Sequence, residues 1–213
     1  LALAATIPAA RPASAREAAP SVRVLAFTKT AGFRHASIPV AVAALRQLGE
    51  RHGFVLDATE DAAVFSARSL ARYDVVVFLL TTGAVLDEHQ QAAFKRYIGT
   101  GGGYVGVHSA ADTEYGWPWY GRLVGAYFES HPAIQQAVIT VADTRHPSTQ
   151  QLPQRWVRTD EWYAFRSNPR GSVRVLATLG ETTYDPGDSS MGGDHPIAWS
   201  HEYEGGRAWY TAG

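Results

Sequence analysis

The chain has 213 residues, of which 46% are hydrophobic and 18% are charged, and its 19 basic and 20 acidic residues leave a formal net charge of −1. A chain of this length and composition can bury a substantial core, and no run of like charge recruits nucleic acid or an anionic membrane, so we expect a small-molecule partner. Cysteine is absent, which excludes disulfides, thiolate nucleophiles and sulfur-ligated metal sites within this chain.

Residues 1–21 resemble the end of a secretory leader whose start is missing. An apolar stretch leads to Ala13-Ser14-Ala15, an A-x-A cleavage pattern, and polar residues follow it. The pattern predicts a secreted or periplasmic protein, and an Ala/Pro-rich leader with no signal function is the alternative. No run of the sequence reaches the roughly 18 apolar residues of a membrane span, so none is expected. Residues 22–213 are then expected to form one domain.

The next segments alternate between strand and helix patterns. Residues 22–27 predict a first strand, and from Ser37 the apolar positions fall on one helical face as far as Gly53. Residues 54–58 predict a second strand and residues 74–80 a strand covered on both faces. Residues 87–99 predict a helix with a D-x-x-Q capping box. This order predicts a parallel, doubly wound α/β layer with its crevice at the carboxyl ends of the strands.

A glycine-rich strand then runs into a sharp turn with His108 at its tip. Gly106 and Ala110 stand two places on either side, where a nucleophile elbow needs small residues. Imidazole at the tip suits a general acid, a general base or a metal ligand better than an acyl-transfer nucleophile. Ser109 is beside the tip instead of on it, which argues against a Ser-His-Asp triad. The glycines at 101–103 precede the strand, which argues against a phosphate-binding loop.

The second half of the sequence is less regular. Strands are expected over residues 133–141 and 172–179, and a closing hairpin over residues 197–210 with its turn at 204–206. Four aromatic residues crowd together near Gly116, and they fit either a sugar-stacking wall or buried loop packing. They are Tyr115, Trp117, Trp119 and Tyr120.

Four of the eight histidines follow loop or glycine-rich segments beside predicted strand ends: His35, His108, His131 and His195. Three neutral imidazoles with a carboxylate such as Glu161 would make a site for zinc or a related divalent metal. The spacing has no H-E-x-x-H or H-x-H character, and loop histidines often bond a carbonyl or a substrate hydroxyl instead. Glu161 lies among aromatic residues, so it is either a general acid of raised pKa or a partner of Arg158 or Arg166.

Several segments, in this order, resemble the trehalose-utilisation (ThuA-like) family, a branch of the class I glutamine amidotransferase-like fold. They are residues 23–25 with 32–35, 101–110, 128–132, 160–163, 194–199 and 206–211. The resemblance implies a flavodoxin-like three-layer α/β sandwich with a mainly parallel central sheet. It implies that His108 replaces the amidotransferase cysteine, so glutaminase activity is not expected. It also implies a role in disaccharide or oxidised-sugar metabolism, and fusion to other carbohydrate-active modules. The family pattern continues past Thr211 to a Gly-His pair, so we expect a chain truncated at its C-terminus.

Two hypotheses of function follow. In the first, the chain hydrolyses or isomerises a sugar derivative; His108 is the central acid/base or metal ligand, His35 and His131 position or ligate, and Glu161 is the second acid/base. In this hypothesis the metal candidates are His35, His108 and His131, and the carbohydrate contacts are Trp117, Trp162, Tyr163, Asp194 and His195. In the second, the chain is a non-catalytic carbohydrate-binding or interaction domain of a larger exported protein, with Trp117, Trp119, Trp162 and Tyr163 as stacking platforms. The sequence leaves open whether the chain is an enzyme.

Overall fold

One half of the central sheet is parallel. The computed structural model describes residues 21–213, so the expected leader at residues 1–21 lies, apart from Ser21, outside the described residues. Five strands follow the order β2-β1-β3-β4-β11, and each neighbouring pair is parallel. This is the flavodoxin-like strand order with β11 in fifth place. Their bounds are β1 Val22–Phe27, β2 Phe54–Thr59, β3 Val75–Leu79, β4 Gly103–Val107 and β11 Gly206–Thr211.

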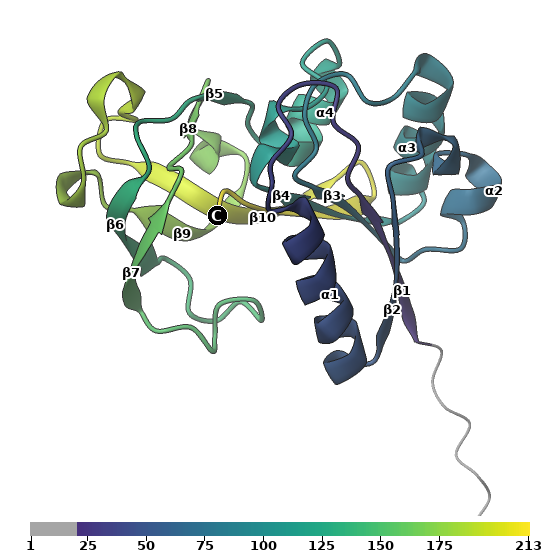
Figure 1. The fold of residues 1–213 in the computed structure, drawn as a ribbon, viewed down its shortest axis with the longest axis horizontal. Helices are drawn as coiled ribbons and strands as arrows, with labels where there is room; N and C mark the ends of the chain where they lie inside the picture. Colours follow the sequence, from purple (N-terminus) through teal and green to yellow (C-terminus); the bar gives the residue numbers. More distant parts are fainter. Residues whose placement is uncertain (1–20) are drawn as a thin grey trace, which may run out of the picture.

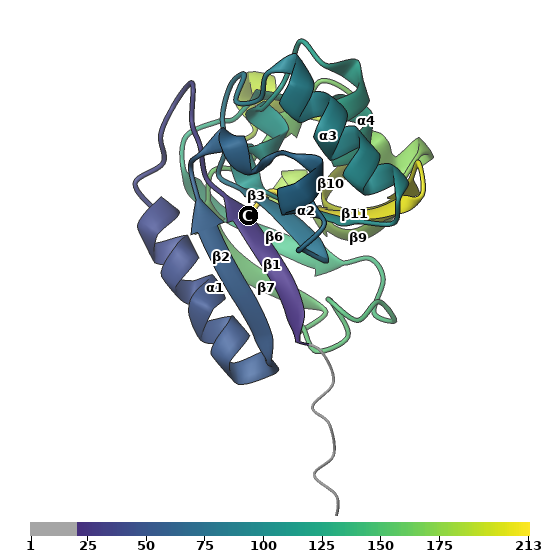
Figure 2. The ribbon, with the colours of Figure 1, turned by 90° about the vertical axis from the view of Figure 1, so that its right-hand side faces the viewer.

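Helices cover both faces of this parallel half (Figure 2). The helix α1 (Ile38–His52) packs on one face and ends at Gly53, whose φ of 77° suits a residue without a Cβ. The helices α2 (Ala67–Leu70), α3 (Glu88–Gly99) and α4 (Pro118–Val124) lie on the other face. The predicted capping box at Asp87 and Gln90 opens α3. Parallel strands covered by helices explain the apolar run of β3.

The other half of the sheet is antiparallel (Figure 1). Beyond β11 come β10 (His195–Tyr203), β9 (Arg174–Leu179), β6 (Gln135–Val141) and β7 (Arg155–Asp160), each antiparallel to its neighbour. The expected α/β fold is confirmed, but a mainly parallel sheet is wrong. The antiparallel half begins at the tight hairpin at Glu204 and Gly205, which reverses the chain between β10 and β11 with φ angles of 45° and 98°, and β9, β6 and β7 continue the antiparallel pairing from there.

Short elements complete the described chain. The strands β5 (Phe128–Ser130) and β8 (Ala164–Phe165) pair antiparallel outside the main sheet. Single 3₁₀ turns lie at Ala62–Val64, His108–Asp112, Pro169–Gly171, Glu181–Thr183 and Gly187–Ser189. No helix within residues 21–213 has the length and hydropathy of a membrane span.

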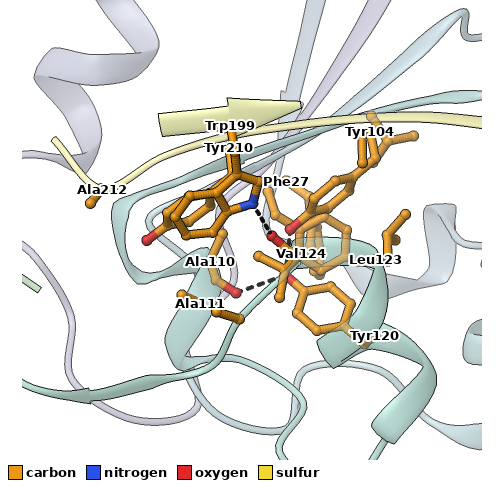
Figure 3. Close-up of a cluster of buried hydrophobic side chains, with 14 of the residues drawn as sticks. Phe27, Tyr104, Ala110, Ala111, Tyr120, Leu123, Val124, Trp199, Tyr210 and Ala212 are labelled. Carbon is orange, nitrogen blue, oxygen red and sulfur yellow. Dashed lines mark hydrogen bonds between the residues drawn. The ribbon is translucent and has the colours of Figure 1, made fainter. Parts of the chain in front are cut away.

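Large aromatic side chains fill the core between the sheet and α4 (Figure 3). Their polar atoms are paired inside the core: the Trp199 indole donates to the Val124 carbonyl at 2.8 Å, and the Tyr104 and Tyr120 hydroxyls lie 2.8 Å apart. The Tyr120 hydroxyl also donates to the carbonyl of Ala110 at 2.9 Å. Buried polar groups that are paired in this way fix a single packing arrangement. Through the bond to Ala110, the core fixes the position of the turn that follows β4.

Candidate functional site

The sharp turn predicted after β4 is present at His108. The backbone of His108 has a φ of 53°, a left-handed conformation that side chains other than glycine adopt at a cost. A Cβ at Gly106 would lie 2.7 Å from the Tyr104 hydroxyl oxygen, so only glycine fits beneath the turn. The Tyr210 hydroxyl donates to the His108 carbonyl at 2.8 Å. The turn presents the imidazole at the carboxyl end of the parallel strands.

Four side chains predicted from the sequence converge there, and we call them the histidine cluster: His35, His108, His131 and Glu161. They follow β1, β4, β5 and β7 in turn. The carboxylate oxygen Glu161 Oε2 lies 3.2 Å from His108 Nε2, 3.7 Å from His35 Nε2 and 4.0 Å from His131 Nε2. Glu161 comes directly after β7, which lies at the edge of the sheet, and its carboxylate meets His108 in the turn after β4.

A cavity of about 300 Å³ is lined by three members of the histidine cluster, His35, His108 and Glu161. Its wall includes Ser37 just before α1, Ile134, and the C-terminal Gly213. Three larger cavities, of about 570, 500 and 460 Å³, lie elsewhere and contain no member of the histidine cluster. The smallest of these four cavities is the one in which His35, His108 and Glu161 bring their side-chain atoms close together, so we take it as the candidate site.

The orientation of the His108 ring is fixed by its surroundings. Its Nδ1 lies 2.5 Å from the Ala212 carbonyl oxygen, and since a carbonyl can only accept, Nδ1 donates and carries the proton. One face of the ring stacks on Tyr163, with centroids 4.1 Å apart, and His35 meets it edge-on at 4.8 Å. Only Nε2 is left to face the cavity and Glu161.

Neither arginine considered as a partner of Glu161 binds it. Arg158 pairs with Asp160 at 2.8 Å, and Arg166 pairs with Glu129 at 3.1 Å. The cationic or titratable partners of Glu161 among the described residues are the three histidines. The carboxylate therefore belongs to the site and not to a surface ion pair.

Burial shifts the titration of two groups at the site. The pKa of His35 is lowered, first because burial disfavours the charged ring and second because His108 lies beside it, while Glu161 acts in the opposite direction. The pKa of the Tyr163 phenol is raised by burial and by the negative charge of Glu161. Tyr163 is therefore neutral at physiological pH, and its ring is a flat wall behind His108.

The structure places three of the expected carbohydrate contacts away from the cavity. Trp162 has only 1% of its surface exposed and its indole donates to the Gln135 carbonyl, so it is a core residue and offers no face for stacking a sugar. Trp117 stacks on Trp119 at 4.8 Å next to α4. Asp194 is held by Arg170. The sequence could not separate these residues from site residues, because buried and sugar-stacking aromatics have the same local pattern.

His195 is completely buried and supports the site from behind. Its Nε2 donates to the Tyr163 carbonyl at 2.7 Å, and its Nδ1 lies 3.0 Å from Glu181 Oε1. Glu181 also accepts hydrogen bonds from the backbone N–H groups of Met191 and Gly193. Burial by itself would raise the pKa of Glu181, but these hydrogen bonds outweigh burial and the pKa is lowered. His195 is thus a positioning residue for the segment that carries Glu161. Sequence analysis missed Glu181, which no local motif marks.

Comparisons with known proteins concern the sequence and the fold of the chain as a whole. The family model described as trehalose utilisation (ThuA) matches residues 23–213. A protein from Bacteroides uniformis described as ThuA-like has 28% sequence identity and a TM-score of 0.77, covering 95% of this chain and 85% of its own. A ThuA-like protein from Parabacteroides merdae, at 22% identity and a TM-score of 0.72, covers 91% and 79%. A β-galactosidase from Rahnella sp. R3, at 15% identity and 0.58, covers 91% of this chain and 28% of its own, a likeness of fold alone. Among curated proteins, none is a significant match.

Proposed function

This chain belongs to the trehalose-utilisation (ThuA) family, and on that premise we propose that it hydrolyses or isomerises a disaccharide or oxidised-sugar derivative at the histidine cluster. The observation that carries the proposal is the convergence of His108 Nε2 and Glu161 Oε2, 3.2 Å apart, on the floor of a cavity at the carboxyl ends of the parallel strands. Ligands bind at this edge in open α/β sheets.

The His108–Glu161 pair is suited to moving protons. Because Nδ1 of His108 already donates to the Ala212 carbonyl, any second proton on the ring lies on Nε2, against the carboxylate. The pair can hold this proton on the imidazole or on the carboxyl group, and both ends face the cavity. In hydrolysis the proton goes to the leaving oxygen while the other group takes one from water. In isomerisation the pair removes a proton beside a carbonyl and returns it at the neighbouring carbon.

Two further observations support catalysis over simple binding. His108 keeps a left-handed backbone conformation that costs about 1–3 kcal/mol, and strain of this kind collects at active sites. The stacking platforms needed for a non-catalytic carbohydrate-binding domain are weakened, because Trp119, Trp162 and Tyr163 are buried. The absence of cysteine from the sequence argues against glutaminase chemistry at the turn.

The test is turnover of a panel of neutral and keto-disaccharides, including trehalose and its oxidised forms, followed by mass spectrometry. Hydrolysis adds one water to the substrate, whereas isomerisation leaves the mass unchanged, so one assay distinguishes the reactions. We expect His108→Ala and Glu161→Gln to lower turnover by about 10²–10⁴-fold. His89→Ala in α3, remote from the cavity, is the matched control and should keep full turnover. Turnover unchanged in both site variants, or absent across the panel, contradicts the proposal.

A further inference from the structure

Three imidazole rings aim the same nitrogen atom at one carboxylate oxygen. The Nε2 atoms of His35, His108 and His131 lie 3.7, 3.2 and 4.0 Å from Glu161 Oε2. The ligand atoms of His35, His108 and Glu161 all lie within 4.8 Å of one another. Four separate segments of the chain supply these groups, so their convergence is a property of the fold and not of one local motif.

The opposite nitrogen of each ring is held by an oxygen. Nδ1 of His108 donates to the Ala212 carbonyl at 2.5 Å, and Nδ1 of His131 donates to the Pro132 carbonyl at 2.8 Å. Nδ1 of His35 lies 3.4 Å from the Ser109 hydroxyl, which can accept its proton. In a neutral ring whose Nδ1 carries the proton, Nε2 presents a lone pair. Histidines that ligate metals are oriented in this way, by a hydrogen bond from the nitrogen that does not ligate.

These three lone pairs and the carboxylate oxygen repel one another unless a positive charge lies between them. A single proton between His108 and Glu161 leaves the His35 and His131 nitrogens without a partner. A proton on every ring would place three cations around one carboxylate, in a site that is partly shielded from water. One divalent cation at the centre interacts favourably with all four atoms at once.

We propose that His35, His108, His131 and Glu161 bind one divalent transition-metal cation, for which Zn²⁺ is the best match in ligand type. Zinc takes imidazole nitrogen and carboxylate oxygen at about 2.0–2.2 Å, which in a tetrahedron separates ligand atoms by roughly 3.3–3.5 Å. The observed separations from Glu161 Oε2 are 3.2 to 4.0 Å, so the longest has to close by about 0.5–0.7 Å. His35, His108 and Glu161 already form a group whose ligand atoms lie within 4.8 Å of one another, and His131 has to move toward the other two rings to complete the set. His131 is the most exposed of the three rings, with 39% of its side chain accessible, and can close onto the cation.

The inference deepens the proposed function and rests on it for the substrate, but not for binding of the cation itself. Zinc can take a fifth ligand at catalytic sites, and the cavity beside His35, His108 and Glu161 has room for a water or a substrate oxygen. A cation at this point polarises a carbonyl oxygen or lowers the pKa of a bound water. Both effects suit a keto-sugar or a glycoside as substrate.

The test is calorimetric titration of chelator-treated protein with ZnCl₂. We expect one Zn²⁺ per chain, and X-ray absorption of the loaded protein should give nitrogen and oxygen ligands at about 2.0–2.2 Å. Loss of an outer hydrogen-bond partner of a ligand costs about 10–100-fold in affinity, so loss of a ligand in His108→Ala or Glu161→Gln should cost at least about 100-fold. His131→Ala changes a partly exposed loop side chain and therefore tests the site even if a buried variant fails to fold.

Two remote histidines provide the matched controls. His52 ends α1 and His89 lies in the first turn of α3, and replacing either by alanine should leave zinc affinity and stoichiometry unchanged. Absence of stoichiometric binding, or binding that survives His131→Ala and Glu161→Gln undiminished, overturns the cation site. Binding of zinc without turnover of any sugar overturns the proposed function alone. Turnover that is unaffected by removal of all metal overturns the catalytic role of the cation, whereas binding is judged by the titration.

Discussion

The backbone strain at His108 predicts an unusual order of stability between two variants. His108→Ala and His108→Gly both remove the stacking on Tyr163 and the bond to the Ala212 carbonyl. They differ in the backbone, because alanine retains the cost of a φ of 53° and glycine does not. The difference between the two variants therefore isolates the strain at the turn. We expect the glycine variant to be the more stable of the two.

The magnitude follows from two opposing contributions. A left-handed conformation costs a residue with a Cβ roughly 1–2 kcal/mol. On folding, glycine loses more conformational entropy than alanine, which costs about 0.5–1 kcal/mol of stability. The two ranges leave a net of about 0–1.5 kcal/mol in favour of His108→Gly, with a central value of about 0.7 kcal/mol. With a urea slope of roughly 3 kcal/mol per molar for a chain of this size, this central value shifts the unfolding midpoint by about 0.2–0.3 M.

Urea unfolding monitored by circular dichroism measures this shift. The unfolding midpoints of the two variants are compared with one common slope of free energy against urea concentration. Ala41→Gly within α1 is the control, because at an ordinary helical position glycine is less stable than alanine. This variant should lose about 1 kcal/mol of unfolding free energy. If His108→Gly unfolds at the same or a lower urea concentration than His108→Ala, the turn is not strained. The left-handed backbone at His108 would then carry no energetic cost for holding the imidazole in the site.

Three other predictions concern the core and the response to pH. Gly106→Ala should destabilise the fold by about 1–3 kcal/mol in the same urea assay, because the added methyl group meets the Tyr104 hydroxyl. Trp162→Ala should cost about 3–5 kcal/mol and Trp117→Ala less than half as much, and equal losses would contradict the assignment of Trp162 to the core. Burial lowers the pKa of His201 below its usual value of 6.5, so as the pH falls the unfolded state binds a proton at this residue before the folded state does. The free energy of unfolding should therefore decrease as the pH drops below 6.5. His201→Gln should make this decrease smaller, which thermal unfolding between about pH 5 and 7 measures.

The parallel half of the sheet was predictable from the sequence because its signals are local. Short apolar runs and the glycine that ends α1 locate β1, α1, β2 and β3 within a residue or two. The same signals indicate that His35 and His108 follow strands of one parallel sheet, and the carboxyl ends of such strands share an edge. Their proximity follows from topology alone.

In the antiparallel half, the expected strands over residues 133–141 and 172–179 and the closing hairpin are present as β6, β9 and β10–β11, but the pairing of these strands and the strand β7 were not predictable. The strand β7 lies at the edge of the sheet, and its sequence, with Arg155, Arg158 and Asp160, has no apolar alternation because most of its side chains are exposed. The position of Glu161 beside His108 depends on pairings between residues far apart in the chain. His131 and Glu161 were therefore candidates through residue type and family resemblance, and their meeting with His108 required the structure.

The most direct test of the histidine cluster is a crystal structure of the zinc-loaded protein with anomalous diffraction measured at the zinc edge. We expect one strong anomalous peak, at about 2.0–2.2 Å from Nε2 of His35, His108 and His131 and from the carboxylate of Glu161. A map with no peak within reach of these four side chains, or with the zinc held elsewhere on the chain, would contradict this expectation.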